Sequence, residues 1–290
     1  MPALDGRCTL RSEDRGEPPA GTASTVPRWL LIESAGPWGR QGLLDGRLPD
    51  GIGRSLHDLG HAKRARVLLI RRVDRRPAVP DAVTCFAVDA RGSAPWIGWR
   101  LLPSIEAATA VDPDDRSAFE PFAGPLAVVC THGRRDACCA ERGRPLAQAT
   151  AAAFPDATWE STHVGGDRFA ANLVLFPHAL YFGRVEAVRG PEIVGAYADG
   201  RIVLDRFRGR STIPMFAQAA EIHVRTADGL DGLDDVVVED ARLDGDEGLV
   251  RVRAGAAVRE VRVRAELGAP MRLTCSSAAE ERPVTWRVHT

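Results

Sequence analysis

The stretch that decides the fold is PLAVVCTHGRRDACCAERGRPLAQA, residues 125–149. It opens with an apolar run typical of a buried strand, and residues 143–154 favour a helix with Pro145 in its first turn. Between the two lie Cys130, Cys138 and Cys139, three cysteines within ten residues. This order predicts an α/β protein that carries thiols where a strand ends and a helix begins.

Apolar runs bounded by turn residues predict further strands on both sides of this stretch. The upstream strands are expected at 28–34, 64–74, 81–90 and 95–102, with a helix near 53–64. The downstream strands are expected at 168–177 and 179–187, with a helix at 191–202. Each group runs strand, loop, helix, strand, strand, and residues 29–40 align with 126–136. We therefore expect a thioredoxin-like α/β fold with two related α/β halves.

The last third of the chain has a different pattern. Residues 248–267 alternate apolar and arginine side chains, which predicts a half-exposed antiparallel hairpin. Residues 271–277 and 283–290 predict a second strand pair, whereas the first 27 residues are expected to be irregular. With the polar link 111–124 as a boundary, we expect an N-terminal α/β half at 1–110, a thioredoxin-like domain at 120–225 and a C-terminal antiparallel β segment at 226–290.

Composition narrows the class of protein. The 290 residues carry a net charge of −1, so no overall field points to nucleic acid or to an acidic membrane. No apolar run reaches the roughly 18 residues of a membrane helix, and the N-terminus lacks the apolar core of a signal peptide. We expect a cytoplasmic protein, where the six cysteines are more suited to metal binding or redox chemistry than to disulfides.

A histidine and a carboxylate downstream of the cysteines are further candidate ligands. Thiols near a helix N-terminus ionise more easily, and thiolates are ligands of zinc and of iron–sulfur clusters. Residues 159–178, WESTHVGGDRFAANLVLFPH, add His163 and, four residues later, Asp167 on a glycine loop. Such a loop allows close approach of the backbone, so both side chains can point at one centre.

Other interpretations of the same residues stay open. A cysteine on a strand is usually a small core residue, and a histidine beside glycines is more often a cap than a ligand. Adjacent cysteines diverge, so at most one of Cys138 and Cys139 faces the same centre as Cys130. A phosphatase loop would need arginine where Asp136 stands, and C-x-x-C, zinc-finger, P-loop, dinucleotide and nucleophile-elbow motifs are missing. Structural roles are the default for Cys8, Cys85, His57, His132 and His178.

Residues 130–149 and 159–185 together resemble the sucrase/ferredoxin-like family of thioredoxin-like 2Fe–2S ferredoxins. EPPAGTA (17–23), residues 29–40 and RLTC (272–275) also resemble its bacterial members, so the resemblance spans most of the chain. It implies two cysteine ligands nine residues apart, Cys130 and Cys139, and two histidines in an H-V-G-G-H loop. His163 matches the first histidine, but the second falls on Asp167, where this sequence departs from the pattern.

The departure leaves three hypotheses for the fourth ligand. In the first, Asp167 is the fourth ligand and binds through an oxygen. In the second, the thiol of Cys138 or Cys275 takes this place. In the third, the fourth ligand position is open or the cluster is lost. Thiolate or imidazole suits iron–sulfur chemistry better than carboxylate. We nevertheless favour Asp167, because it occupies the matching position.

The resemblance implies an electron carrier rather than an enzyme, with a 2Fe–2S cluster and a protein redox partner, and with no nucleic acid or membrane as partner. Arg134, Arg135 and Arg168 lie near the expected ligands and can dock an acidic partner. The competing hypothesis is a thiol-redox protein of thioredoxin-like fold that uses Cys130 with Cys138 or Cys139 and has no cluster. A cluster-free binding protein and a zinc site are further alternatives.

Overall fold

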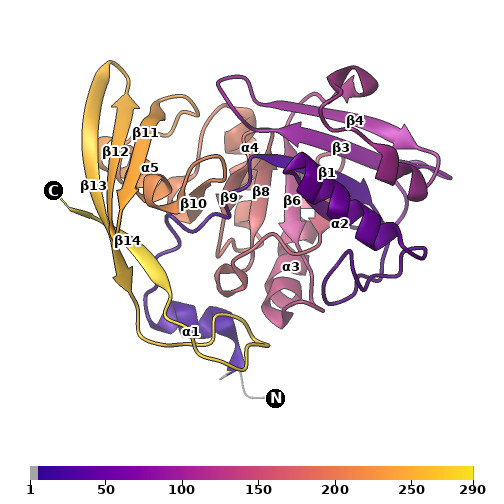
Figure 1. Cartoon of the computed structure of the whole chain (residues 1–290), viewed down its shortest axis with the longest axis horizontal. Helices are drawn as coiled ribbons and strands as arrows, with labels where there is room; N and C mark the ends of the chain where they lie inside the picture. Colours follow the sequence, from indigo (N-terminus) through magenta and orange to yellow (C-terminus); the bar gives the residue numbers. More distant parts are fainter. Residues whose placement is uncertain (1–5, 290) are drawn as a thin grey trace.

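The structure, a computed structural model, describes residues 6–289 and contains two sheets (Figure 1). The large sheet is mixed, with ten strands in the order β10-β9-β8-β6-β7-β2-β1-β3-β4-β5. The second sheet is antiparallel, with four strands in the order β11-β12-β13-β14. The expected α/β class and the C-terminal antiparallel segment are therefore confirmed.

The first half of the large sheet is built around a buried central strand. β1 pairs with β2 in parallel, across the helix α2, and with β3 in antiparallel. Every residue of β1 is buried, as expected for a strand covered on both faces. The elements are β1 (Arg28–Glu33), α2 (Ile52–Lys63), β2 (Arg66–Arg71), β3 (Val83–Asp89), β4 (Trp96–Leu102) and β5 (Glu120–Pro121).

The second half repeats the pairing of the first. β6 pairs with β7 in parallel, across the helix α3, and with β8 in antiparallel, and β9 and β10 continue the sheet. β2 and β7 pair in antiparallel and join the two halves into one sheet. The elements are β6 (Leu126–Cys130), α3 (Ala137–Ala153), β7 (Thr158–Ser161), β8 (Leu173–Phe176), β9 (Leu180–Phe182), α4 (Arg189–Ala198) and β10 (Phe207–Arg210).

The small sheet packs on helix α5 (Met215–Asp228), which also contacts β10 of the large sheet (Figure 1). Val250, Val252, Val261 and Val263 face α5 and are buried, whereas the arginines between them are exposed. The period-two pattern thus forms the expected hairpin, β12 with β13. The strands are β11 (Val236–Asp244), β12 (Glu247–Ala254), β13 (Ala257–Leu267) and β14 (Val284–His289).

Two expectations about helices were wrong. The first 27 residues contain a short helix, α1 (Cys8–Asp14), which contacts the segment after β7. Helix α3 begins at Ala137 rather than at residue 143, because the Asp136 carboxylate accepts the Cys138 N–H at 2.9 Å and caps it. Pro145 consequently lies inside the helix and not at its start.

The strand pair expected at 271–277 and 283–290 was also wrong in part. β14 forms, but residues 271–277 make only an isolated bridge between Met271 and Glu281. The polar side chains and Pro270 favour a loop there, and Figure 1 places this loop beside α1. Besides α1, five elements were not predicted from the sequence: α5, β5, β7, β10 and β11.

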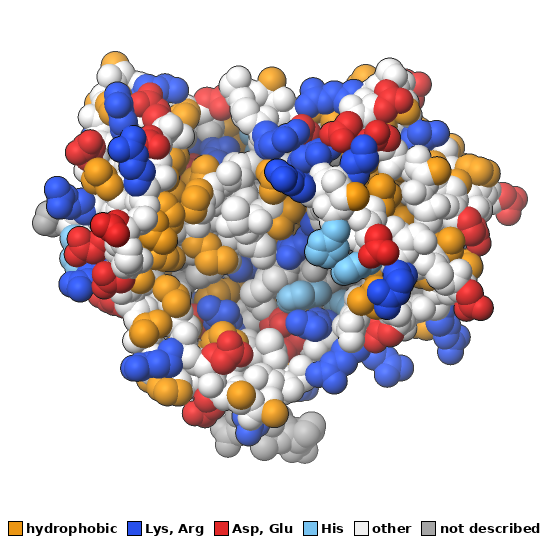
Figure 2. Space-filling view, viewed as in Figure 1, with side chains coloured by type: hydrophobic (Ala, Val, Ile, Leu, Met, Phe, Trp, Pro, Cys, Tyr) orange, Lys and Arg blue, Asp and Glu red, His pale blue; other side chains and the backbone are white. Residues whose placement is uncertain are grey.

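Short 3-10 helices complete the chain at Glu106–Ala110, Arg116–Ala118, Asp167–Phe169 (η4) and Leu204–Arg206. Within residues 6–289, none of the helices is both long and apolar enough to cross a membrane. Acidic and basic side chains are interspersed on the face shown in Figure 2, as the small net charge implies.

Candidate metal centre

Cys130 and Cys139 are brought together by the contact between β6 and α3. Cys130 is the last residue of β6, Cys139 lies in the first turn of α3, and both are fully buried. Gly143 makes the contact possible, because a Cβ at this position would lie 2.1 Å from the Cys130 carbonyl oxygen. The missing side chain therefore sets the distance between the two cysteines.

His163 reaches the same place from the neighbouring strand. β7 runs parallel to β6, with Ser161 opposite Cys130, so the loop after β7 begins at the sheet edge where β6 ends. Gly165 and Gly166 take positive φ angles of 103° and 78°, which glycine adopts without strain. The fully buried Arg208 donates to the Gly165 carbonyl oxygen at 3.1 Å and fixes the loop.

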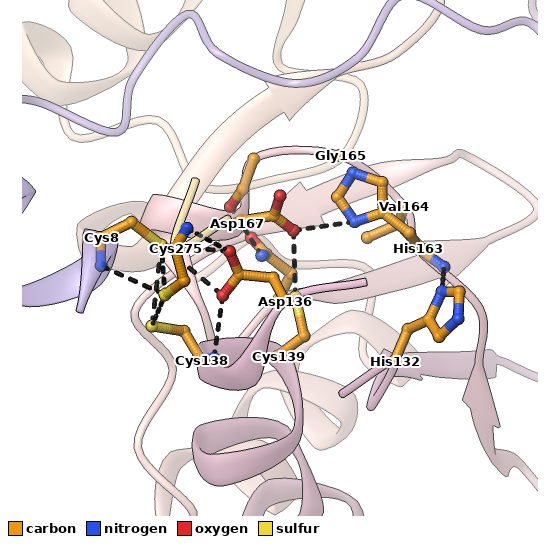
Figure 3. A network of polar contacts seen from close by, with 12 residues as sticks. Cys8, His132, Asp136, Cys138, Cys139, His163, Val164, Gly165, Asp167 and Cys275 are labelled. Carbon is orange, nitrogen blue, oxygen red and sulfur yellow. Dashed lines mark hydrogen bonds and ion pairs between the residues drawn. The ribbon is translucent and has the colours of Figure 1, made fainter. Parts of the chain in front are cut away.

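Three donor atoms converge at this edge. The two cysteine sulfurs and a His163 ring nitrogen lie within 4.8 Å of one another. Asp167 completes the group, because its Oδ1 accepts from Cys139 Sγ at 3.1 Å and lies 2.9 Å from His163 Nδ1 (Figure 3). His163 Nδ1 is buried, and the Asp167 carboxylate lies against it as an ion-pair partner. Two thiols, an imidazole and a carboxylate thus meet at one place, and thiolate and imidazole are donors that zinc and iron–sulfur centres use.

The charges of these groups depend on one another. A contact from Cys139 lowers the pKa of Cys130 against the effect of burial, and His163 adds to the lowering. Burial alone would lower the pKa of His163, but the Asp167 carboxylate and Cys130 raise it to about 9. Burial would raise the pKa of Asp167, but His163 lowers it. Without metal, the group thus holds a proton on His163 that a cation would replace.

His132 positions His163 from the first residues after β6. Its Nδ1 accepts the backbone N–H of His163 at 3.2 Å, and its Nε2 donates to the Gly39 carbonyl oxygen at 2.6 Å. This pattern fixes the neutral tautomer, and burial lowers the pKa of His132 accordingly. The sequence did not reveal that His132 binds the backbone of His163. The one signal for this role was its position two residues after Cys130.

The family model described as Sucrase/ferredoxin-like matches residues 19–209, more than half of the 290 residues. The chain belongs to the sucrase/ferredoxin-like family. The resemblance stated above is thereby confirmed at the level of the family. No curated protein and no solved structure matches the chain.

The segment shared with the sucrase/ferredoxin-like family contains the whole converging group: Cys130, Cys139, His163 and Asp167. Cys138 and Cys275, the candidate replacements for Asp167, lie elsewhere. Their sulfurs are 3.3 Å apart, in a second group with Cys8 and Asp136 (Figure 3). Adjacent residues Cys138 and Cys139 thus diverge, as expected, and each belongs to a different group.

The arginines expected near the site have different surroundings. Arg168 is held by Glu17, with Nε–O distances of 2.8 and 3.0 Å. Arg134 lines an open cleft beside His132, together with Arg75 and Arg144. These three arginines are exposed, and none makes an ion pair with another residue of 6–289. The segment matched by the family model therefore presents three exposed arginines, without ion-pair partners among residues 6–289, next to the converging group.

Proposed function

We propose that the chain is an electron carrier in which Cys130, Cys139, His163 and Asp167 hold a 2Fe–2S cluster. The observation that carries the proposal is the convergence of two buried thiols and a His163 ring nitrogen within 4.8 Å of one another, with the Asp167 carboxylate against both Cys139 and His163. When bound, such a cluster takes up and releases single electrons.

The donor set suits this group. Thiolate and imidazole are the ligands that iron–sulfur centres use, and the donors come as two pairs from two segments. Cys130 and Cys139 belong to β6 and α3, and His163 and Asp167 to the loop after β7 and the start of η4. Asp167 supplies a negative oxygen where the family pattern has a neutral imidazole. This oxygen already contacts a donor from each pair.

Burial assigns different tasks to the four side chains. Both cysteines are inaccessible, and the Asp167 side chain is 3% exposed, so these residues exclude water from the centre. The His163 side chain is 24% exposed and forms the outer edge of the group. We infer that a protein redox partner approaches at His163, beside the arginine-lined cleft.

The topology supports a thioredoxin-like fold for both halves. Each half has a central strand paired in parallel across a helix and in antiparallel with the following strand. We further propose that the chain divides into an N-terminal α/β half at 1–110, a thioredoxin-like domain at 120–225 and a C-terminal β segment at 226–290. We also propose that the protein is cytoplasmic.

The deciding experiment is anaerobic purification followed by a visible spectrum, iron and sulfide analysis, and EPR after dithionite. We expect a coloured protein with about two irons and two sulfides per chain and a spin-half signal on reduction. Cys130→Ser and Asp167→Ala should lose the colour. Cys85→Ser, at a buried cysteine on β3 outside both groups, is the matched control. A colourless wild-type protein without iron, even after reconstitution, would refute the proposal.

Cys275→Ser tests the identity of the fourth ligand in the same assay. Because the Cys275 sulfur lies in the second group, this variant should keep the colour that Asp167→Ala loses. The opposite result would favour ligation by a thiol in place of Asp167.

A single zinc ion is the second candidate for this centre. The observation in its favour is that the donor atoms of Cys130, Cys139 and His163 lie within 4.8 Å of one another. Such a separation suits tetrahedral ligands around one ion. Metal analysis separates the candidates, since this one requires zinc, no sulfide and no colour.

The thiol-redox alternative has less support from the geometry. Thiol–disulfide exchange requires that a thiolate reach its partner, but Cys130 and Cys139 are both 0% exposed. Cys138 is also buried, and its sulfur contacts Cys8 and Cys275 rather than Cys130.

A further inference from the structure

We propose a second metal site, formed by Cys8, Cys138, Cys275 and Asp136, that takes a single thiophilic divalent cation such as Zn²⁺. The three sulfurs form a nearly equilateral triangle (Figure 3). The Sγ–Sγ distances are 3.6 Å for Cys8 and Cys138, 3.3 Å for Cys138 and Cys275, and 3.5 Å for Cys275 and Cys8. None of the four residues belongs to the group proposed to hold the cluster.

The triangle suits a metal better than a disulfide. Bonded sulfurs lie about 2.05 Å apart, and a disulfide would leave one of the three thiols unused. Four ligands at the Zn–S distance of about 2.3 Å form a tetrahedron with edges of about 3.8 Å, close to the separations in this group. The thiols therefore need little movement to bind one ion.

Asp136 supplies the fourth donor. Its Oδ1 and Oδ2 lie 3.7 and 3.6 Å from Cys8 Sγ, and all four donors lie within 4.8 Å of one another. Backbone N–H groups of Cys138 and Cys275 donate to the carboxylate at 2.9 and 2.6 Å and fix its orientation. A carboxylate has about four lone-pair positions, so an oxygen remains available for the ion.

Burial increases the need for a cation. Cys8, Cys138 and Asp136 are at most 2% exposed, and Cys275 is half-buried. Thiolates and a carboxylate without a positive partner would be costly in such a place. The neighbouring arginines Arg7 and Arg142 already pair with Glu141 and Glu13.

The donors come from three distant parts of the chain. Cys8 begins α1, Asp136 and Cys138 cap and begin α3, and Cys275 lies in the loop between β13 and β14. Only the α3 residues fall within the segment matched by the family model. A metal here would fasten the N-terminal helix and the C-terminal loop to the helix that also carries Cys139.

The test measures metal content and stability of the full-length protein, purified anaerobically, by elemental analysis and native mass spectrometry. We expect Cys8→Ser and Cys275→Ser each to lose one zinc ion per chain, and Cys85→Ser to lose none. Cys130→Ser should keep this zinc. A chelator should lower the melting temperature of the wild type but not that of Cys275→Ser.

Cobalt(II) provides a second measurement that does not depend on the metal acquired in the cell. Added to chelator-treated protein, it should produce the intense visible bands of tetrahedral cobalt thiolate, and these bands should be lost in Cys275→Ser and kept in Cys130→Ser. Unchanged metal content in both Cys8→Ser and Cys275→Ser would overturn the inference. So would a disulfide between any two of the three cysteines, or loss of the zinc in Cys130→Ser.

The inference is separable from the proposed function. A wild-type protein without iron, whose zinc still depends on Cys8 and Cys275, would refute the electron carrier alone.

Discussion

At the scale of single residues, the replacement of the second histidine of the family pattern by Asp167 has a measurable consequence. A carboxylate adds negative charge to the centre, whereas an imidazole ligand raises the potential of a cluster. Asp167→His should therefore keep the iron and raise the reduction potential by on the order of 100 mV. Potentiometry followed by the visible spectrum measures it. An unchanged potential would mean that Asp167 is not a ligand.

A second prediction for a single residue concerns His178. Its Nδ1 is hydrogen-bonded to the Tyr197 hydroxyl at 2.6 Å. Burial, and then Arg210, lower the pKa of His178 to about 4, against a small opposite effect of Asp234. Below about pH 6.5, the ordinary pKa of histidine, His178 is protonated in the unfolded chain but stays neutral in the folded chain down to about pH 4. The free energy of unfolding therefore falls as the pH falls from about 6.5 to 4.

His178→Gln isolates this contribution, because an amide can still bond to Tyr197. The wild type should lose about 1–2 kcal/mol more of its unfolding free energy than the variant between pH 7 and 4.5. Urea unfolding at several pH values measures the difference. Parallel pH profiles for the two proteins would contradict it.

At the scale of elements, the contact between α3 and β6 depends on Gly143. Gly143→Ala would place a methyl group 2.1 Å from the Cys130 carbonyl oxygen and push the helix away from the strand. We expect a loss of several kcal/mol of stability, on the scale of overpacked cores, and loss of the metal at Cys130 and Cys139. Thermal unfolding and metal analysis check both effects.

Gly195→Ala, inside α4, is the matched control. Its methyl group would meet only Phe154 at 3.9 Å, so the better helix propensity of alanine should leave the protein unchanged or stabilise it by about 0.5–1 kcal/mol. Equal behaviour of the two alanine variants would show that the close approach at Gly143 does not set the position of α3.

Elements with a strong local pattern could be predicted from the sequence, and the others could not. β1 and the β12–β13 hairpin follow from apolar runs and period-two alternation. α1 is short and polar, and its contacts lie far away in the chain, so its own residues carry little signal. The two sites differ in the same way. Cys130, Cys139 and His163 could be predicted because they match a family pattern. Cys8 and Cys275 could not, because they are 267 positions apart in the sequence and only the fold brings them together.

At the scale of the whole molecule, the near-neutral net charge hides a local basic surface. Arg75, Arg134 and Arg144 line one cleft beside His132, which itself touches His163. A positive cleft raises the rate of encounter with negative partners, and salt weakens the effect. The reduced protein should therefore react faster with an anionic oxidant such as ferricyanide than with a cationic cobalt complex of similar driving force. The rate with ferricyanide should fall as ionic strength rises.

Arg134→Glu combined with Arg144→Glu should slow ferricyanide several-fold at low salt, reverse the preference between the two oxidants and leave the visible spectrum unchanged. Arg262→Glu, on the exposed side of β13 in the small sheet, makes the same kind of charge change away from the cleft and serves as the control. Stopped-flow oxidation of the three proteins at several salt concentrations compares them directly. Arg262→Glu changes the net charge by half as much as the cleft variant. If it lowered the logarithm of the rate by half as much or more, total charge would govern encounter, and electrons would not leave preferentially by the His163 edge.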